Sequence, residues 1–339
     1  MHLQYNKFLT FYALGFLSLF ISTAHAESYH ADAIGIFDLK NNQYLYKKNI
    51  LKKRAPASTI KVLAALTAWA NAPDINAYVS VSARAAAAQP TKAGLKKGEQ
   101  YRIVDLIQTC LVASCNDAAS ALAEGVAGSE YAFALKMQKF ANQVGCSQTQ
   151  ATNASGLPKP KGMTSSINDS IKIIKVLLQN EKLKKMMQIQ SFNLISKKGR
   201  KIPLRNHNRL LKGFEYNVIG KTGYTILAQH CFLSAGSTKD KSIVVSVLGN
   251  KKKYLWNDLK SAYRKHLSSQ QYLPRFMANN KISLTKIHTL LKSKGYSLKK
   301  SENIYGYYTR QAIKRFQIDR SLSVDGIIGP QTWATLNRN

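Results

Sequence analysis

The chain has 339 residues, more than one domain usually contains, so we expect one large domain and one smaller one. Its 50 lysine and arginine residues exceed its 17 aspartate and glutamate residues, and the formal net charge is +33. The lysines are spread along the chain and form no block with interleaved aromatic residues, which argues against nucleic acid as the partner and favours an anionic cell wall or membrane surface. A proteome that is rich in lysine throughout is the alternative explanation.

The first 26 residues fit an export signal. Lys7 precedes an apolar stretch of roughly fifteen residues, and the small-residue sequence Ala24-His25-Ala26 follows. A membrane anchor is the less favoured alternative, because this stretch is shorter than the roughly 20 residues that span a bilayer. We expect cleavage after Ala26, a mature chain of net charge +32 with no transmembrane segment, and a location in the periplasm or cell wall.

Strands are predicted near both ends of the large domain and helices between them. Residues 33–46 alternate around Asn41-Asn42, which predicts two strands and a tight turn. Helices are predicted from about Ser58 and over 104–113, 117–127, 129–145 and 167–188. Residues 215–249 predict further strands, punctuated by glycines. This order implies one sheet formed by both ends of the domain, with a helical body inserted.

A second, smaller unit follows. Residues 250–283 are polar and poorly patterned, so we place a linker at 266–283 between a domain over 27–265 and a unit over 284–339. In the small unit, apolar side chains recur at helical spacing at Leu284, Ile287, Leu290 and Leu291, at Ala312, Ile313 and Phe316, and at Trp333 and Leu336. Three short helices with one modest core predict an all-α unit that binds a ligand and performs no chemistry.

Ser58 and Lys61 form a Ser-x-x-Lys sequence at the predicted start of an apolar helix. Residues three apart share a helix face, so the amine can reach the hydroxyl. Burial beside residues 62–65, the helix N-terminus and the absence of a neighbouring carboxylate all favour a neutral lysine that accepts the serine proton. The alternative from these residues alone is a serine N-cap followed by a solvated lysine.

Two further short motifs carry groups that suit the same chemistry. Ser114-Cys115-Asn116 lies between two predicted helices, where a bend can point a hydroxyl and an amide the same way. Lys221-Thr222-Gly223 lies in a predicted strand, so Lys221 and Gly223 share a face, and a glycine lets a substrate backbone approach closely. This geometry suits an extended peptide that lies along the strand.

Together, in this order, the three motifs resemble those of the penicillin-binding serine enzymes, and most of all the low-molecular-mass D-alanyl-D-alanine carboxypeptidases. The likeness covers residues 30–262 and includes "NASGLP" at 153–158 and "NHNRLL" at 206–211. It implies an α/β (α+β) fold of the β-lactamase/transpeptidase type, an antiparallel sheet with a helical body. It also implies removal of the terminal D-alanine from peptidoglycan stem peptides through an acyl-enzyme, and covalent inhibition by β-lactams.

The resemblance also implies a role for each motif residue and no metal or other cofactor. The hydroxyl of Ser58 is the nucleophile and Lys61 its proton acceptor, and the backbone N–H groups of Ser58 and Tyr224 form the oxyanion hole. Ser114 and Lys221 pass a proton to the leaving D-alanine, and Asn116 holds the substrate amide. Lys221 and Thr222 bind the terminal carboxylate, and Gly223 leaves room for the peptide.

Three rival functions stay open at this stage. A class A serine β-lactamase needs a Glu-x-x-Leu-Asn loop, which does not occur between Asp117 and Lys221. A DD-endopeptidase of peptidoglycan cross-links uses the same residues with a different cleft shape. A wall-binding protein with an inactive catalytic fold is the third rival, and the presence of all three motifs argues against it.

The sequence departs from the family pattern at Cys115, where Gly or Ala is more common, and at Gln229, where a glycine is common. We expect Cys115 to crowd the cleft or to pair with Cys110. Sequence alone cannot rank the disulfide pairings among Cys110, Cys115, Cys146 and Cys231, and no spacing predicts a zinc site.

The small unit is similar to the peptidoglycan-binding three-helix module. The likeness covers residues 284–337 and rests on an aromatic-Gly pair, a Phe-Gln pair and the ending Asp-Gly-x-x-Gly-Pro-x-Thr-Trp. It implies that peptidoglycan is both the substrate of the large domain and the ligand of the small one. We expect Phe316 and Trp333 to lie in the core of this unit and not to stack on sugars.

Overall fold

The computed structural model describes residues 29–160, 162–267, 277, 280, 282–296, 298, 305 and 307–338. The predicted export signal and most of the predicted linker lie outside the described residues. In the part of the chain that is described, no helix combines the length and the apolar character that crossing a membrane requires.

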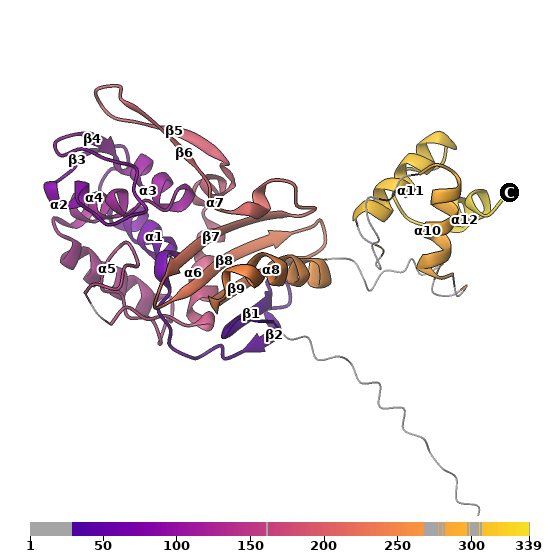
Figure 1. Ribbon diagram of the computed structural model, residues 1–339, viewed down its shortest axis with the longest axis horizontal. Coiled ribbons are helices and arrows are strands. Elements are labelled where there is room, and N and C mark those ends of the chain that lie inside the picture. Colours follow the sequence, from indigo (N-terminus) through magenta and orange to yellow (C-terminus); the bar gives the residue numbers. More distant parts are fainter. Residues whose placement is uncertain are drawn as a thin grey trace, which may run out of the picture.

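A five-stranded antiparallel sheet forms the centre of the larger unit (Figure 1). Its strands, in their order across the sheet, are β2 (Gln43–Lys48), β1 (Ala33–Asp38), β9 (Ser242–Asn250), β8 (Gln229–Ser237) and β7 (Asn217–Thr225). Because β1 pairs with β9, the start and the end of the domain meet in the middle of the sheet. The predicted order of strands, helices and strands is confirmed, and so is the predicted fold class.

The inserted helices form a body whose last two members pack against one face of this sheet. They are α1 (Lys61–Asn71), α2 (Ala83–Ala86), α3 (Ile103–Val112), α4 (Asn116–Ala127), α5 (Glu130–Gln143), α6 (Ile167–Gln179) and α7 (Glu181–Gln188). The single helix predicted over 167–188 is wrong, because Asn180 leaves the helical conformation after α6 and its side chain caps α7 by accepting from the N–H of Leu183.

The other face of the sheet is covered by α8 (Lys252–Leu267), which the sequence analysis did not predict. Leu255, Leu259 and Tyr263 recur at helical spacing and are buried against the sheet, but charged residues between them obscure the pattern. Two short ribbons were also not predicted: β3 (Tyr78–Ser80) with β4 (Gln100–Arg102), and β5 (Ser191–Ile195) with β6 (Lys201–Arg205). The last two residues of α8 fall inside the range proposed for the linker.

The C-terminal unit consists of α10 (Leu284–Ser293), α11 (Tyr307–Asp319) and α12 (Pro330–Leu336), with a core of its own. Phe316 is fully buried, as predicted. Trp333 is only partly buried at the edge of this core, and Lys286 Nζ lies 5.3 Å from its ring centroid.

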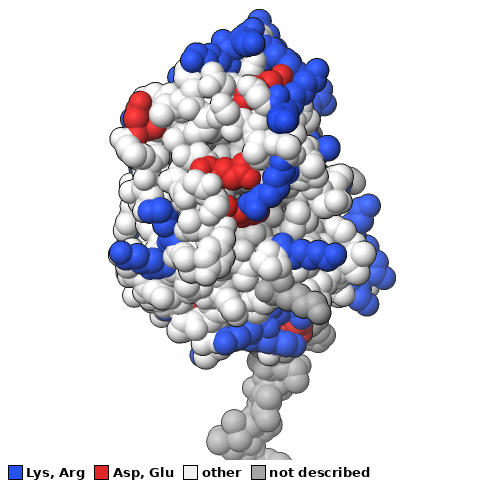
Figure 2. Space-filling model, turned by 90° about the vertical axis from the view of Figure 1, so that its left-hand side faces the viewer, with Lys and Arg blue, Asp and Glu red and all other residues white. Residues whose placement is uncertain are grey.

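Positive charge is distributed over the surface. Figure 2 shows one face of the molecule, on which lysine and arginine side chains form several separate groups, one of them across the top, and acidic side chains are few. This agrees with the scattered lysines of the sequence and with the absence of a single basic block.

Candidate active site

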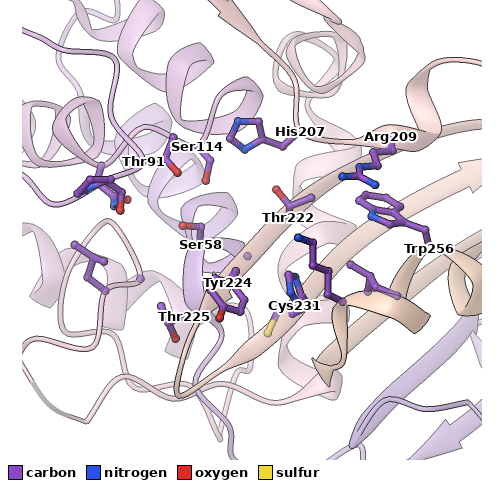
Figure 3. Close-up of a pocket in the computed structure, with 18 residues that line it drawn as sticks. Ser58, Thr91, Ser114, His207, Arg209, Thr222, Tyr224, Thr225, Cys231 and Trp256 are labelled. Atoms are coloured by element: carbon purple, nitrogen blue, oxygen red, sulfur yellow. Dashed lines mark hydrogen bonds between the residues drawn. The ribbon is translucent and has the colours of Figure 1, made fainter.

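Ser58 lies in the 3-10 turn η1 (Ala57–Ile60), and α1 begins only at Lys61. The turn opens with Ala57 in the left-handed region, at φ 47°, a conformation that a residue with a side chain adopts only under local constraint. The predicted helix that begins near Ser58 is confirmed, with the difference that its first turn is 3-10 and not α-helical. Ser58 lines a cleft of about 350 Å³, in which its hydroxyl is partly exposed (Figure 3).

Lys61 is fully buried, and its amine touches three oxygen atoms. Its Nζ lies 2.9 Å from Ser58 Oγ, 2.7 Å from Asn116 Oδ1 and 2.6 Å from the backbone oxygen of Ser155. The two carbonyl oxygens can only accept, so in the neutral amine they take both N–H groups. The lone pair of Lys61 then faces the Ser58 hydroxyl, the one neighbour that can donate a proton.

Burial lowers the pKa of Lys61 to about 8, because the charged form loses its hydration. About a tenth of the amine is therefore neutral at pH 7, far more than for a solvated lysine. The geometry and the lowered pKa together suit an amine that accepts a proton from Ser58, and they exclude the alternative of a solvated lysine beside a serine N-cap.

The bend between α3 and α4 places Ser114 opposite the strand β7. Ser114 has φ 62°, which turns its hydroxyl toward Lys221, whose Nζ lies 2.7 Å from Ser114 Oγ and 2.8 Å from the backbone oxygen of Thr222. Burial, and secondarily the charge of Lys61, lower the pKa of Lys221 well below its ordinary value. The pair thus forms a hydrogen-bonded path along which a proton can pass.

Asn116 connects the buried amine to the rim of the cleft. Its Oδ1 accepts from Lys61, and its Nδ2 donates to the backbone oxygens of Gln89 and Pro90 at 2.9 and 3.1 Å. The next residue, Asp117, is buried, and its carboxylate accepts backbone N–H groups from residues 93–95. The segment 89–95 is thus fastened to the start of α4, and its residues Pro90 and Thr91 line the cleft.

The strand β7 approaches the nucleophile through a glycine. A Cβ atom built on Gly223 would lie 3.0 Å from the backbone nitrogens of Ser58 and Thr59, so a side chain here would push the strand away. Thr222, Gly223 and Tyr224 all line the cleft. Every residue predicted for the site therefore lies in or directly beside this cleft, including Ser58, Lys61, Ser114, Asn116, Lys221, Thr222, Gly223 and Tyr224.

The loop 153–157 contributes a functional group to which the sequence analysis gave no role. Asn153 Oδ1 accepts from the N–H groups of Ser155 and Gly156 and from the Ser155 hydroxyl, and this fixes the Ser155 carbonyl against Lys61. Gly156 has φ +84°, and a Cβ there would lie 2.1 Å from the Ala57 oxygen. The stretch "NASGLP" pointed to this loop. The group that accepts from Lys61 is the backbone oxygen of Ser155, however, and the residue type does not predict its role.

The cysteines differ from the expectations. All four are buried free thiols, so Cys110 and Cys115 are not paired. Cys115 packs in the main core and does not line the cleft, whereas Cys231 does. Burial raises the pKa of the Cys110 and Cys115 thiols to about 12. Gln229 occupies the left-handed region at φ 58°, which explains why glycine suits this position.

The cleft residues support covalent chemistry by a serine. Among the described residues, no cluster of histidine, cysteine, aspartate or glutamate is arranged to hold a metal ion. The cleft itself brings together a hydroxyl, a buried amine, and a second hydroxyl–amine pair. These groups can activate a nucleophile on one side of a bound carbonyl and protonate a leaving amine on the other.

Comparison with known proteins agrees with this chemistry. The family model described as D-alanyl-D-alanine carboxypeptidase, of peptidase family S11, matches residues 21–252, and a model of a peptidoglycan binding domain matches residues 283–336. The chain is 31% identical to D-alanyl-D-alanine carboxypeptidase DacB2 of Mycobacterium tuberculosis over 63% of this chain and 72% of that protein. It is also 31% identical to DacF of Bacillus subtilis, over 66% of this chain and 58% of that protein.

Solved structures share the fold. The crystal structure of a D-alanyl-D-alanine carboxypeptidase from M. tuberculosis is 28% identical, with a TM-score of 0.65, over 70% of this chain and 90% of that one. A variant of the Streptomyces K15 DD-transpeptidase has a TM-score of 0.66 at 22% identity, over 70% of this chain and 98% of that one, which shows the fold alone. From its motifs, its fold and the match over residues 21–252, the chain belongs to the D-alanyl-D-alanine carboxypeptidase family, peptidase family S11.

Proposed function

We propose that the protein is a serine-type carboxypeptidase that removes the terminal D-alanine from peptidoglycan stem peptides. The observation that carries the proposal is the position of Lys61. Its amine donates to two carbonyl oxygens, and its third contact is Ser58 Oγ, 2.9 Å away. Family membership supports the reaction class, and the cleft along β7 suits an extended peptide.

In the proposed reaction, Lys61 takes the Ser58 proton as the hydroxyl oxygen attacks the carbonyl carbon of the penultimate D-alanine. The backbone N–H groups of Ser58 and Tyr224 stabilise the developing oxyanion, a contribution of a few kcal/mol for such donors. The C–N bond breaks, and the leaving amine receives a proton through Ser114 and Lys221, which lie 2.7 Å apart. Water then attacks the ester, and the shortened peptide leaves with a restored Ser58 hydroxyl.

The substrate contacts follow from the same placement. Thr222 lines the cleft, and the amine of Lys221 lies 2.8 Å from the Thr222 backbone oxygen. These two residues are the proposed receptor for the terminal carboxylate. Asn116 also lines the cleft and is the proposed contact for the substrate amide. Substrate binding at Asn116 requires an exchange of partners, because its amide already bonds to Lys61 and to residues 89 and 90.

Penicillin is expected to acylate Ser58 and to remain attached. Family membership supports β-lactam binding, and the sequence lacks the Glu-x-x-Leu-Asn loop that activates the deacylating water of class A β-lactamases. A serine β-lactamase is therefore not favoured. Rapid hydrolysis of nitrocefin by the purified protein would instead support a β-lactamase.

The test is intact-mass measurement after penicillin treatment, with peptide mapping of the adduct, together with D-alanine release from a pentapeptide. Ser58→Ala is expected to abolish the adduct and to lower D-alanine release by at least about 1,000-fold. Ser283→Ala is the matched control, since Ser283 and Lys286 form the same Ser-x-x-Lys spacing outside the cleft. An adduct on Ser58→Ala, or undiminished D-alanine release, would refute the proposal.

The proposed setting is the periplasm or the cell wall. It rests on the export-signal pattern of residues 1–26 and on the peptidoglycan binding domain matched at 283–336. In this proposal a catalytic domain over 27–265 and a wall-binding domain over 284–339 are joined by residues 266–283, and the small domain keeps the enzyme near its polymeric substrate. Sequencing the N-terminus of the exported protein would test cleavage after Ala26.

A further inference from the structure

The ribbon β5–β6 connects the two walls of the cleft from outside it. One wall is β7, and the other consists of the segment 89–95 and the start of α4. At the base of the ribbon the chain continues into Asn208, which is buried and donates from Nδ2 to the backbone oxygen of Val218 in β7 at 2.7 Å. The tip of the ribbon lies beside β4 (Figure 1), where the N–H of Lys197 donates to the backbone oxygen of Gln100 at 2.9 Å.

Arg200 fastens this tip with two hydrogen bonds. Its guanidinium donates to Glu99 Oε2 at 2.7 Å and to the backbone oxygen of Gly94 at 3.0 Å, so one side chain bridges both ends of the loop between these two residues. The Glu99 carboxylate is fixed in turn, because it also accepts from the Tyr101 hydroxyl at 2.8 Å. Only 35% of the Arg200 side chain is exposed, and both of its acceptors belong to the loop that precedes and includes the start of β4.

The peptide group of Gly94 is held from two sides. Its oxygen accepts from Arg200, and its N–H donates to Asp117 Oδ2 at 2.8 Å. Asp117 is fully buried in the first turn of α4, directly after Asn116. The tip of the ribbon and the start of α4 are therefore linked through a single peptide group.

The segment fastened in this way orients Asn116. The backbone oxygen of Thr91 accepts from the N–H of Asn116 at 2.7 Å, and the oxygens of Gln89 and Pro90 accept from its Nδ2 at 2.9 and 3.1 Å. Because the amide nitrogen is directed at these two oxygens, Oδ1 faces the amine of Lys61, 2.7 Å away. A displacement of the segment 89–95 would therefore turn Asn116 and move the amine that contacts Ser58.

We infer that the β5–β6 ribbon sets the separation of the two cleft walls, and that Arg200 is a positioning residue that acts on the reaction through Asn116 and Lys61. Arg200 lies outside the described lining of the cleft. An arginine suits this task, because its planar guanidinium donates in two fixed directions, here to a carboxylate and to a backbone carbonyl. The inference rests on the proposed function of the same cleft and adds a residue that holds the cleft in its reactive shape.

The first test measures the rate constant for acylation of Ser58 by a fluorescent penicillin, at a temperature well below the thermal melt of each variant. Arg200→Gln is expected to lower this rate constant about tenfold, because small displacements of reacting groups are costly. Arg200→Lys should recover part of the loss, since an ammonium group is a single point charge and cannot replace the planar fork. Arg205→Gln is the matched control, which removes the same charge from an exposed position of β6 and should leave the rate unchanged.

A double-mutant cycle separates positioning from a general loss of stability. In an Asn116→Ala background the path from Arg200 to Lys61 is already broken, so Arg200→Gln should lower the acylation rate by less than about twofold more. Should Arg200→Gln fail to fold, the same cycle is run with Arg200→Lys, for which a loss of about threefold is expected in the unaltered background alone.

Two results would overturn the inference: an undiminished rate for the Arg200 variant, or an equal loss with and without the Asn116 side chain. If the unaltered protein still forms a penicillin adduct at Ser58, either result leaves the proposed function standing. Absence of that adduct from the unaltered protein would overturn the proposed function and this inference together.

Discussion

At the scale of single residues, the decisive feature is Lys61. Burial lowers its pKa, and two carbonyl acceptors orient its amine so that it can act as a base. Hydration favours the charged amine, and its loss lowers the pKa of Lys61 to about 8. Nearby acidic groups work in the opposite direction, because negative charge favours the charged amine. The balance leaves an amine that titrates close to neutral pH and still points at Ser58.

This balance predicts the pH dependence of acylation. Below a pKa of about 8, Lys61 carries a proton and cannot accept another, so the acylation rate constant should fall about tenfold for each pH unit below roughly pH 7 and level off above roughly pH 9. Lys61→Arg keeps its charge at every accessible pH and should slow acylation by about 1,000-fold or more. Rates of labelling by a fluorescent penicillin between roughly pH 6 and 9.5 measure both effects. A flat profile would contradict the role of Lys61.

At the scale of elements, the site depends on close backbone contacts between segments distant in the chain. Gly156 of the loop 153–157 packs against the turn η1, and Gly223 of β7 packs against the same turn from the strand side. The nucleophile is therefore held between a loop and a strand that both approach through glycines. Rigid backbone contacts of this kind keep the hydroxyl and the amine at a reactive distance.

The glycine contact predicts the effect of Gly156→Ala. The alanine must adopt a left-handed conformation and also place its Cβ 2.1 Å from the Ala57 oxygen, so we expect a loss of about 3 kcal/mol in the free energy of unfolding and acylation slowed by about 100-fold. Gly199→Ala is the matched control, because Gly199 has φ +86° and no atom within 4 Å of the added Cβ. The free energy of unfolding of Gly199→Ala should fall by only about 1 kcal/mol, and its acylation rate should be unchanged. Thermal melts and labelling rates separate the two, and equal effects would count against the packing explanation.

The sequence allowed the sheet and most of the helical body to be predicted from periodicity, and the motif residues of the cleft from their resemblance to a known family. It did not predict α8, whose buried face is interrupted by lysines, or the short ribbons, whose strands have only three to five residues. The contact of the Ser155 carbonyl with Lys61 was also missed. Such contacts arise between distant segments, and neither spacing nor composition records them.

At the scale of the whole molecule, two separate cores and a large positive charge determine how the enzyme meets its substrate. Among the residues that the structure describes, the apolar clusters of the larger unit contain none beyond Leu267, and the C-terminal cluster contains none before Met277. Each unit therefore buries its own apolar surface and does not depend on the other for its core. The net charge of +33 acts over the whole surface and attracts anionic polymer at a range set by salt.

These properties predict how the protein binds isolated cell wall. Retention should fall at least fivefold between roughly 0.05 and 0.5 M NaCl, because salt screens the attraction between exposed charges. A chain that ends at Leu267 should release D-alanine from soluble pentapeptide at an undiminished rate and bind wall material more weakly. Sedimentation with purified sacculi measures retention. Binding that is independent of salt, and unaffected by the truncation, would contradict the proposed wall-binding architecture.

The four unpaired cysteines determine how the chain can mature. Since no covalent link between sulfur atoms holds distant segments together, folding needs no oxidase or isomerase and can reach completion in a reducing compartment. With thiol pKa values of about 11 to 12, these buried groups are almost entirely protonated near neutral pH, which protects them from oxidants. A version without residues 1–26, produced in ordinary bacterial cytosol, should therefore already react with penicillin.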